Sequence, residues 1–440
     1  MDRLNGNEFF GSTFACECGK THRVQPREVV YSDDAADRLP SLCARLCAGR
    51  SAAILMDSRT RAAAGEEAAG AMEASGWRVT RVIVPDPAPG KSPVCDDRTK
   101  DALAAVLGDA DLVLPVGGGV MTDLGKWLAQ ERKLPCAVLA TAASMNGYSS
   151  ANIAPTVGGI KMVLRAEPPA AVLASPKVLR EAPYDLTASG LGDVLAKSVS
   201  SADWRLNHFL FGDYYCRRAV GLIADIEPFY LERPEDLRSR RPQAIAALFR
   251  ALLLTGAAMT MAETSAPASG GEHMISHALD MMSSLDGAPH DLHGRQVGVG
   301  TVLAAELYWR VLAEESPRFV EPRAGVDRAF WGPLAEAVEK EYAAKADRLR
   351  LAQDRLRRGG QWDRLRGELA PMLRPPEAIS RCLRRAGGAC AAGDIGCDRE
   401  RLLAAVLHAH EMRSRFTLLD LANLLGIMPG AGEEIVRTWA

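Results

Sequence analysis

The sequence lacks the features that mark most proteins that bind nucleic acids or insert into membranes. Its 53 Lys and Arg nearly balance its 55 Asp and Glu, for a formal net charge of −2, so it has no excess of cations for phosphate contacts or for an anionic lipid surface. No run approaches about 18 apolar residues, and no apolar signal core follows the first residues. We therefore expect a cytoplasmic protein with no nucleic-acid partner and no stable membrane insertion.

The sequence also lacks a regular cysteine pattern. Its ten cysteines are spaced irregularly through 440 residues, and a chain of this length does not need disulfide bonds to stabilise its core. Cys16, Cys18 and His22 have the residue types of a zinc site, but no further pair of such residues is near them. We therefore expect most cysteines to be thiols and this group to hold no structural metal.

What the chain does have is an alternation of short apolar runs and helix-like stretches. The predicted strands and helices are Ala53–Met56, Arg61–Gly76, Val79–Val84, Asp101–Leu107, Asp111–Val116 and Cys136–Ala140. This repetition predicts an α/β fold with a Rossmann-like parallel sheet and helices on both faces. From about Tyr184, long stretches rich in Ala, Leu and Arg indicate helices. We predict an α/β domain over residues 1–183 and an all-helical domain over residues 184–440.

Three glycines follow the third predicted strand and open a helix. Gly117, Gly118 and Gly119 allow the backbone to approach a diphosphate, and the N–H groups of the helix start favour anions. Their spacing differs from the usual GxGxxG fingerprint, and tight strand-to-helix packing is the structural alternative. Asp57 ends the first predicted strand, where it either binds an adenosine ribose or caps the next helix. The residues alone leave both alternatives open.

Four of the eight histidines fall within 21 residues. His273 and His277 lie four residues apart on one predicted helix face, so both imidazoles can point to one position, and His293 can return to it from the next turn. Asp193 follows a glycine-marked helix start and offers a hard ligand, although a first-turn acid also satisfies the helix dipole. One Asp, two His and an open position together predict a divalent metal site that acts as a Lewis acid.

These motifs resemble the sn-glycerol-1-phosphate dehydrogenases, which share a superfamily with glycerol dehydrogenase, iron-containing alcohol dehydrogenases and dehydroquinate synthase. The matching segments span nearly the whole chain and are Cys16–His22, Gly117–Asp123, Thr141–Ser150, Ser189–Lys197, Gly271–His277, Leu292–Gly294 and Arg415–Leu421. The resemblance implies a dinucleotide-binding domain, a helical domain, and an active site in the cleft between them. There, hydride would pass from nicotinamide to a ketone.

The resemblance also implies roles for individual positions. It makes Asp193, His273 and His293 the metal ligands, and His277 a substrate contact. We expect the proton to reach the product through His277 or an ordered water. His290 is then incidental. The implied cofactor contacts are Asp57 at the ribose, Gly117, Gly118, Gly119, Val120 and Met121 at the diphosphate, and Thr141, Ser144 and Ser150 elsewhere along the dinucleotide.

Two positions depart from the pattern of the relatives. Lys197 stands where the iron-dependent relatives carry a further histidine, and because a protonated lysine cannot ligate, zinc or nickel is favoured over iron. Asn146, predicted as a catalytic residue with Asp193 and His277, replaces an aspartate, which leaves the substrate more open than the reaction type. Lys161, Lys197 and Arg295 are candidates for a substrate phosphate or for salt bridges.

The resemblance implies metal-dependent, NAD(P)H-linked reduction of dihydroxyacetone phosphate to sn-glycerol 1-phosphate, a reaction of phospholipid biosynthesis. Asn146 keeps open a dehydrogenase of another small hydroxyalkyl phosphate, phosphonate or polyol. A dehydroquinate-synthase-like lyase and a non-catalytic binding protein are the further alternatives. The choice between NADH and NADPH and the formation of a homo-oligomer are not decided by the sequence.

Overall fold

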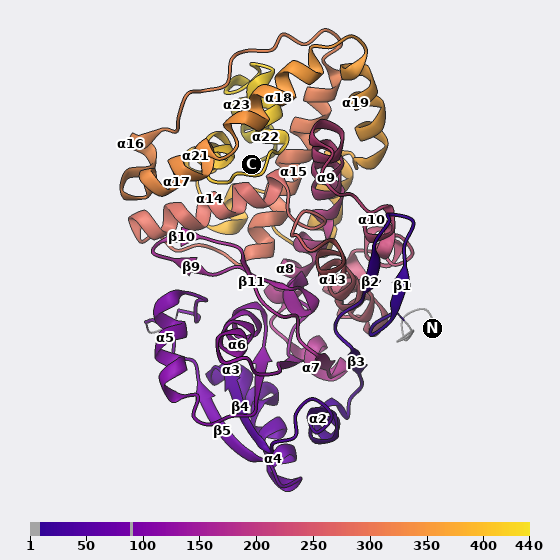
Figure 1. The fold of residues 1–440 in the computed structure, drawn as a ribbon, viewed down its shortest axis with the longest axis vertical. Coiled ribbons are helices and arrows are strands. Elements are labelled where there is room, and N and C mark those ends of the chain that lie inside the picture. Colours follow the sequence, from indigo (N-terminus) through magenta and orange to yellow (C-terminus); the bar gives the residue numbers. More distant parts are fainter. Residues whose placement is uncertain (1–8, 89–90) are drawn as a thin grey trace. The chain divides into compact units, whose positions relative to one another are not determined.

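The computed structural model describes residues 9–88 and 91–440. Contacts divide the chain into two compact units (Figure 1). Unit 1 comprises Met1–Gly190 and Gly221–Ser265, and unit 2 comprises Leu191–Val220 and Ala266–Ala440. The sequence analysis placed everything after residue 183 in one helical domain, whereas Gly221–Ser265 lies in unit 1. The reason is the long helix α13 (Pro242–Ala262), which packs against two elements of unit 1, α7 (Pro176–Glu181) and η2 (Asn146–Ser149).

Unit 1 is built on a six-stranded sheet with the order β3-β12-β7-β6-β4-β5. All neighbouring strands are parallel, as the sequence predicts. The strands are β3 (Glu28–Tyr31), β4 (Ser51–Met56), β5 (Arg78–Ile83), β6 (Leu112–Gly117), β7 (Ala137–Ala140) and β12 (Ala171–Ala174). The sequence analysis missed β3 and β12, which have only four residues each.

Helices cover both faces of this sheet, so its central strands are apolar throughout rather than alternating. On one face, Leu112 and Leu114 of β6 join a core cluster with residues of α2 (Ala35–Cys43) and α4 (Glu66–Ala74). On the other face lies α6 (Gly119–Arg132). A Cβ on Gly125 of α6 would lie 2.6 Å from Pro115 Cγ, so glycine permits this close packing.

Shorter elements complete unit 1: β1 (Thr13–Ala15), β2 (Thr21–Arg23), α3 (Ser58–Thr60), η1 (Arg61–Gly65), α5 (Asp97–Val106), β8 (Asn152–Ile153), β9 (Thr156–Val157), β10 (Ile160–Lys161), β11 (Leu164–Arg165), α11 (Pro228–Leu231) and α12 (Glu235–Arg238). Helix α8 (Tyr184–Leu195) begins in unit 1 and ends in unit 2. Helix α13 is long and apolar enough to cross a membrane by length and composition, but 83% of its apolar window is buried. Its hydrophobicity is accounted for by its place in the core.

Unit 2 is helical, as predicted, and its described residues form no strand. Its helices are α9 (Lys197–Phe211), α10 (Arg217–Val220), α14 (Gly271–Asp286), α15 (His293–Ala313), α16 (Arg328–Trp331), α17 (Ala335–Ala343), α18 (Ala346–Leu356), α19 (Gln361–Leu369), α20 (Pro376–Ala386), α21 (Arg399–His408), α22 (Leu418–Leu424) and α23 (Gly430–Trp439). At the contact of α14 and α15, a Cβ on Gly300 would lie 2.6 Å from Glu272 O. This glycine therefore lets the two helices approach closely.

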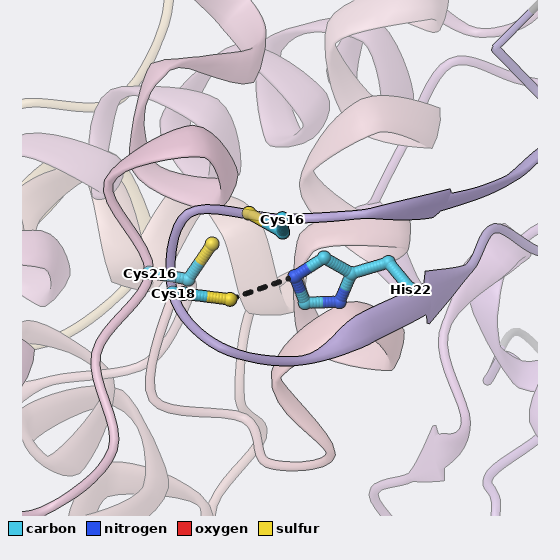
Figure 2. Close-up of side chains that lie close together, drawn as sticks. All are labelled: Cys16, Cys18, His22 and Cys216. Atoms are coloured by element: carbon cyan, nitrogen blue, oxygen red, sulfur yellow. Dashed lines mark hydrogen bonds between the residues drawn. The ribbon is translucent and has the colours of Figure 1, made fainter.

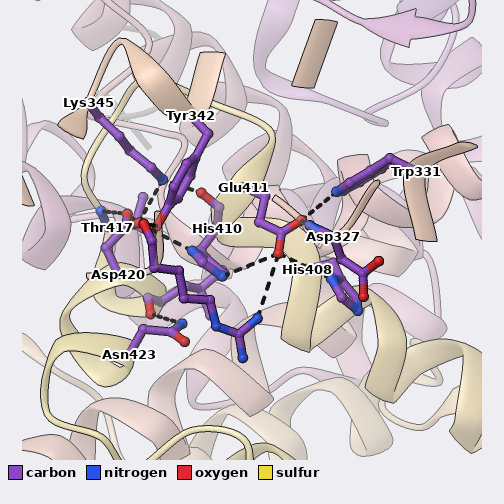
Figure 3. A network of polar contacts seen from close by, with 12 residues as sticks. Asp327, Trp331, Tyr342, Lys345, His408, His410, Glu411, Thr417, Asp420 and Asn423 are labelled. Carbon is purple, nitrogen blue, oxygen red and sulfur yellow. Dashed lines mark hydrogen bonds and ion pairs between the residues drawn. The ribbon is translucent and has the colours of Figure 1, made fainter. Parts of the chain in front are cut away.

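A buried polar network stabilises the C-terminal part of unit 2 (Figure 3). The fully buried Lys345 donates to Asp420 Oδ1 at 2.6 Å and to the carbonyl of His410. Asp420 in turn caps α22 by accepting from the N–H of Thr417 at 2.9 Å. Next to this pair, the Glu411 carboxylate accepts from Trp331 Nε1 at 2.6 Å. These charges are paired and hydrogen-bonded, as buried charges must be.

Candidate active site

Three predicted metal ligands meet in unit 2. Asp193 lies on α8, His273 in the first turn of α14, and His293 is the first residue of α15. One ligand atom from each lies within 4.8 Å of the other two. Asp193 and His273 are buried, and His273 Nε2 lies 3.4 Å from Asp193 Oδ1. A Cβ on Gly192 would lie 1.9 Å from Gly294 O, so only glycine lets α8 approach the start of α15 this closely.

These donors fit a divalent transition-metal ion. One carboxylate oxygen and two imidazole nitrogens form a mixed donor set of the kind found in catalytic sites with a coordination position left for water or substrate. Burial alone would lower the pKa of His273, but hydrogen bonds to Asp193 and Glu272 outweigh it and raise the pKa to about 9. Since metal ligation needs neutral imidazole, cation and proton compete for this side chain.

Glu272 orients the His273 ring. Its fully buried carboxylate accepts from His273 Nδ1 at 2.7 Å and from the N–H of Gly270 at 2.8 Å. With the proton fixed on Nδ1, the lone pair of Nε2 is directed toward Asp193. Glu272 is thus a positioning residue for a ligand, a role that the sequence analysis did not assign.

A second carboxylate fixes the start of α14. Asp203 on α9 accepts from the N–H of Gly271 at 2.7 Å, from the N–H of Leu418 at 2.8 Å and from the Tyr308 hydroxyl. Burial, with a contribution from the nearby Glu272, raises the pKa of Asp203 to about 7. Asp203 and Tyr308 come from separate helices and carry no local sequence motif, so sequence reasoning missed both.

The glycine turn lies in unit 1, at the carboxyl end of β6. Gly118 is the N-cap residue of α6 and brings no side chain to satisfy the first N–H groups of the helix, which leaves them available to an anion. A Cβ on Gly118 would lie 3.3 Å from Ser144 Oγ, and one on Gly119 would lie 3.1 Å from Met145 Cγ. The structure therefore packs the segment after β7 against the glycine turn.

That segment, residues 141–150, contains the other predicted cofactor contacts. The N–H of Thr141 donates to Gly117 O at 3.2 Å, and Ser144 Oγ lies 3.1 Å from the hydroxyl of Tyr148. Ser150 is buried and its Oγ accepts from the N–H of Asn152 at 2.9 Å. Val120 and Met121 lie in the first turn of α6, while Asn146 begins η2.

A buried lysine that the sequence analysis did not single out holds this segment in place. Lys126 on α6 donates to Gly147 O at 3.0 Å and to Asn152 O at 2.5 Å, and its ammonium lies 2.9 Å from Asp123 Oδ1. The other oxygen of Asp123 accepts from the N–H of Ala154 at 3.1 Å. Two residues one turn apart on α6 thus hold the end of this segment and the residues that follow it. Their spacing along the chain was the only signal in the sequence.

Asp57 serves as a helix cap in this structure. Its Oδ1 accepts from the N–H groups of Arg59 at 2.9 Å and of Thr60 at 2.7 Å, and the Thr60 hydroxyl accepts from the N–H of Asp57 in return. Its Oδ2 faces Arg59 at 3.3 Å. The capping alternative is therefore realised, and the ribose contact stays a prediction.

Comparison with known proteins identifies the family. The model of the family described as iron-containing alcohol dehydrogenase matches residues 30–183. The chain is 27% identical over 418 residues to a glycerol-1-phosphate dehydrogenase (NAD(P)+) of Bacillus licheniformis, with 94% of both chains covered. It is 31% identical over 309 residues to the enzyme of that name from Thermococcus kodakarensis, covering 69% of this chain and 85% of the relative. The chain belongs to the glycerol-1-phosphate dehydrogenase family.

The fold agrees with this family assignment. A probable glycerol dehydrogenase from Sinorhizobium meliloti matches with a TM-score of 0.62 at 17% identity, covering 94% of this chain and 98% of that one. A 1,3-propanediol oxidoreductase matches with a TM-score of 0.59 at 18% identity, covering 93% of this chain and all of the other. The chain thus shares its fold, a parallel-sheet region and a helix-rich region, with these two proteins.

The remaining predicted residues of unit 2 differ in their relation to the three-ligand group. His277 on α14 stacks on the His293 ring with centroids 5.6 Å apart. His290 is exposed, with Nδ1 3.5 Å from Asp280 Oδ1. The buried Lys197 donates to the carbonyls of Ala219 at 3.3 Å and Pro267 at 3.5 Å, which fits a protonated amine and not a ligand.

The candidate phosphate contacts differ in their surroundings. Arg295 Nε lies 2.7 Å from Asp291 Oδ2, and its Nη2 donates to Asp394 O at 2.5 Å, so the structure shows the salt-bridge alternative for this residue. Lys161 belongs to the short strand β10 of unit 1 and is half-buried. Its role at a phosphate stays a prediction.

Replacing Glu272 with Gln is expected to weaken metal binding without removing a ligand. Glutamine can still accept from His273 Nδ1, but it carries no charge to increase the basicity of the imidazole. Partners of this kind are worth roughly 10- to 100-fold in metal affinity. Metal competition titrations with a chromophoric chelator measure the change, and Glu336→Gln on the exposed face of α17 is the matched control. Equal affinity in both variants would contradict the assigned role of Glu272.

Proposed function

We propose that this chain is a metal-dependent, NAD(P)H-linked dehydrogenase that reversibly reduces dihydroxyacetone phosphate to sn-glycerol 1-phosphate. The observation that carries the proposal is the convergence of Asp193, His273 and His293 in a chain similar to NAD(P)+ glycerol-1-phosphate dehydrogenases over 94% of its length. A cytoplasmic role in supplying a phospholipid precursor belongs to the same proposal.

The bound groups and the side chains have separate tasks. When bound, a divalent cation polarises a carbonyl oxygen and reduced nicotinamide supplies hydride to the carbonyl carbon. Asp193, His273 and His293 would hold the cation, and Glu272 keeps one imidazole in the ligating orientation. His277, stacked on His293, is the proposed source of the proton that completes the product hydroxyl. Asn146 would hydrogen-bond a substrate hydroxyl as donor or acceptor.

The proposed metal is zinc or nickel rather than iron. The position one turn after Asp193 carries Lys197, whose ammonium donates to two backbone carbonyls. A protonated amine has no lone pair for a metal, so three protein ligands are left, and this number suits zinc or nickel better than the four-ligand iron site.

The proposed dinucleotide site lies along the carboxyl ends of β6 and β7 in unit 1. The diphosphate would bind the N–H groups from Gly117 to Met121 at the start of α6. Thr141, Ser144 and Ser150 would supply further polar contacts from the segment that packs against this turn. Support comes from the uncapped helix start and from the close approach of Ser144 to Gly118.

Turnover with a small substrate panel tests the proposed function. Purified protein loaded with zinc or with nickel is expected to oxidise NADH with dihydroxyacetone phosphate far faster than with unphosphorylated dihydroxyacetone, and to form the sn-1 product. Asn146 favours the alternative of another small hydroxyalkyl phosphate, phosphonate or polyol, so the panel includes these. Faster turnover of one of them would replace the proposed substrate, and tightly bound cofactor with no net NADH loss would favour a lyase.

Replacing Asp57 with Ser is expected to change cofactor preference. Serine keeps the helix cap, but it removes a negative charge that would repel a 2′-phosphate. The ratio of kcat/KM for NADPH to that for NADH should rise about tenfold, equivalent to ~1.4 kcal/mol. Steady-state kinetics with both cofactors measure the ratio, and Asp37→Ser on the exposed face of α2 is the control. An unchanged ratio would remove Asp57 from the proposed ribose site.

A further inference from the structure

The N-terminal hairpin of unit 1 carries a second group of metal-ligating side chains. Strands β1 and β2 pair antiparallel, with His22 opposite Phe14. Between them the chain makes a tight turn in which the N–H of Gly19 donates to Cys16 O at 3.0 Å and the N–H of Cys16 donates to Lys20 O at 2.9 Å. Gly19 has a φ of 86°, a left-handed conformation that glycine adopts without strain.

This turn brings two thiols and one imidazole together. Cys18 Sγ lies 3.2 Å from His22 Nε2, and the sulfurs of Cys16 and Cys18 and a nitrogen of His22 all lie within 4.8 Å of one another. Figure 2 shows these three side chains directed toward one another across the hairpin. Zinc bonds of about 2.3 Å to sulfur and 2.0–2.1 Å to nitrogen place tetrahedral ligand atoms roughly 3.5–3.8 Å apart. This separation lies between the 3.2 Å of the Cys18–His22 pair and the 4.8 Å limit of the group.

We propose that the hairpin binds a structural zinc ion through Cys16, Cys18 and His22. None of the three belongs to the proposed catalytic set, which lies in unit 2, so the inference goes beyond the proposed function. Strands β1 and β2 have three residues each, and an isolated two-stranded hairpin is marginally stable at best. A metal ion would supply the missing stabilisation, since its binding energy becomes folding energy in small elements of this kind.

The packing of the ligands supports a structural role. The His22 side chain is buried, with 2% of its surface exposed, and its ring lies 5.6 Å from that of Phe14. Outside the ligand set, Lys20 of the turn forms an ion pair with Glu263 of unit 1 at 2.9 Å. The His22 ring is thus held by packing, while the two cysteines are half-buried and can release their protons when the metal binds.

The test uses the full chain with His273→Ala, which removes the proposed catalytic site and separates the two proposals. This protein is expected to retain about one equivalent of zinc after desalting, and to show a sulfur-to-cobalt charge-transfer band when loaded with Co²⁺. The Asp193, His273 and His293 set contains no sulfur and cannot give that band. Absence of both zinc and the band in folded His273→Ala protein would overturn the hairpin site, whatever its dehydrogenase activity.

Variants of the hairpin identify the ligands. Adding Cys18→Ser should lower zinc content at least tenfold and abolish the cobalt band, whereas adding Cys47→Ser, a half-buried cysteine elsewhere in unit 1, should change neither. Equal zinc retention in both variants would overturn the assignment, and the cobalt spectrum of the parent protein tests it even if Cys18→Ser misfolds.

Discussion

A His273→Ala protein is expected to lose its active-site metal and its turnover together. Two imidazoles and one carboxylate are the proposed ligands, and removing one leaves Asp193 and His293 to hold the cation alone. Since the cation is proposed to stabilise charge on the substrate oxygen by several kcal/mol, kcat/KM should fall at least about 1,000-fold, equivalent to ~4 kcal/mol. Metal analysis and NADH kinetics on the same preparation measure both effects.

Two histidine variants serve as comparisons for that result. His290→Ala changes an exposed side chain that precedes the proposed ligand His293 by three residues, so this variant should keep both metal and activity. His277→Ala should keep the metal but lose activity, because His277 is proposed to contact substrate and not to ligate. The metal mechanism would be wrong if His273→Ala retained full activity after chelation, and the division of roles would be wrong if His277→Ala lost the metal as well.

The convergence of Asp193, His273 and His293 could be predicted from the sequence. Histidine is rare in this chain, and neighbouring glycines draw attention to Asp193. Half of the eight histidines lie in one short stretch, and two glycines directly precede Asp193, so a shared site is the simplest interpretation. The structure places Asp193, His273 and His293 together. The residues that orient them left no such signal, because Glu272 resembles any first-turn acid and Asp203 lies far away in sequence.

The fold could be predicted from the sequence where a pattern of apolar residues extends over a whole strand or helix. Strands β4 and β6 are six residues long, buried throughout and almost entirely apolar, and α13 has 21 residues, so their type is clear from sequence. The sequence does not show to which unit α13 belongs, because its apolar surface is equally compatible with either core. Contacts such as Ser149 Oγ to Leu253 O, at 2.5 Å, decide that it packs in unit 1, and they join residues about 100 positions apart.

The hairpin illustrates a different limit of sequence reasoning. No further pair of ligand residues lies near Cys16, Cys18 and His22 along the chain, and the common zinc motifs consist of such pairs. In the structure, the antiparallel register returns His22 to the two cysteines. A group of side chains brought together by strand pairing depends on that register, and the pattern of a three-residue strand does not reveal the register.

Replacing Lys345 with Met is expected to destabilise unit 2 by about 3–5 kcal/mol, the usual cost of leaving one partner of a buried ion pair uncompensated. Methionine fills a similar volume but leaves Asp420 buried without its cation and the carbonyl of His410 without its donor. Thermal unfolding should show a Tm lower by roughly 10 °C. Lys340→Met on the exposed face of α17 is the control and should leave Tm nearly unchanged.

The pH dependence of stability gives a second readout of the same ion pair. Burial would raise the pKa of Asp420, but Lys345 and His410 outweigh it and hold the pKa below its usual value. A carboxyl whose pKa falls on folding stabilises the fold above its unfolded pKa of about 4, and this contribution is lost as pH falls through the lower folded pKa. Without Lys345, burial should raise that folded pKa, so lowering the pH should protonate Asp420 and relieve its uncompensated charge. The difference in Tm between Lys345→Met and the parent protein should therefore become smaller as the pH falls. Adding Asp420→Asn removes the uncompensated charge and should restore part of the lost Tm, because asparagine can still accept from Thr417. If the double variant is no more stable than Lys345→Met, the loss comes from packing, and the ion pair does not stabilise unit 2.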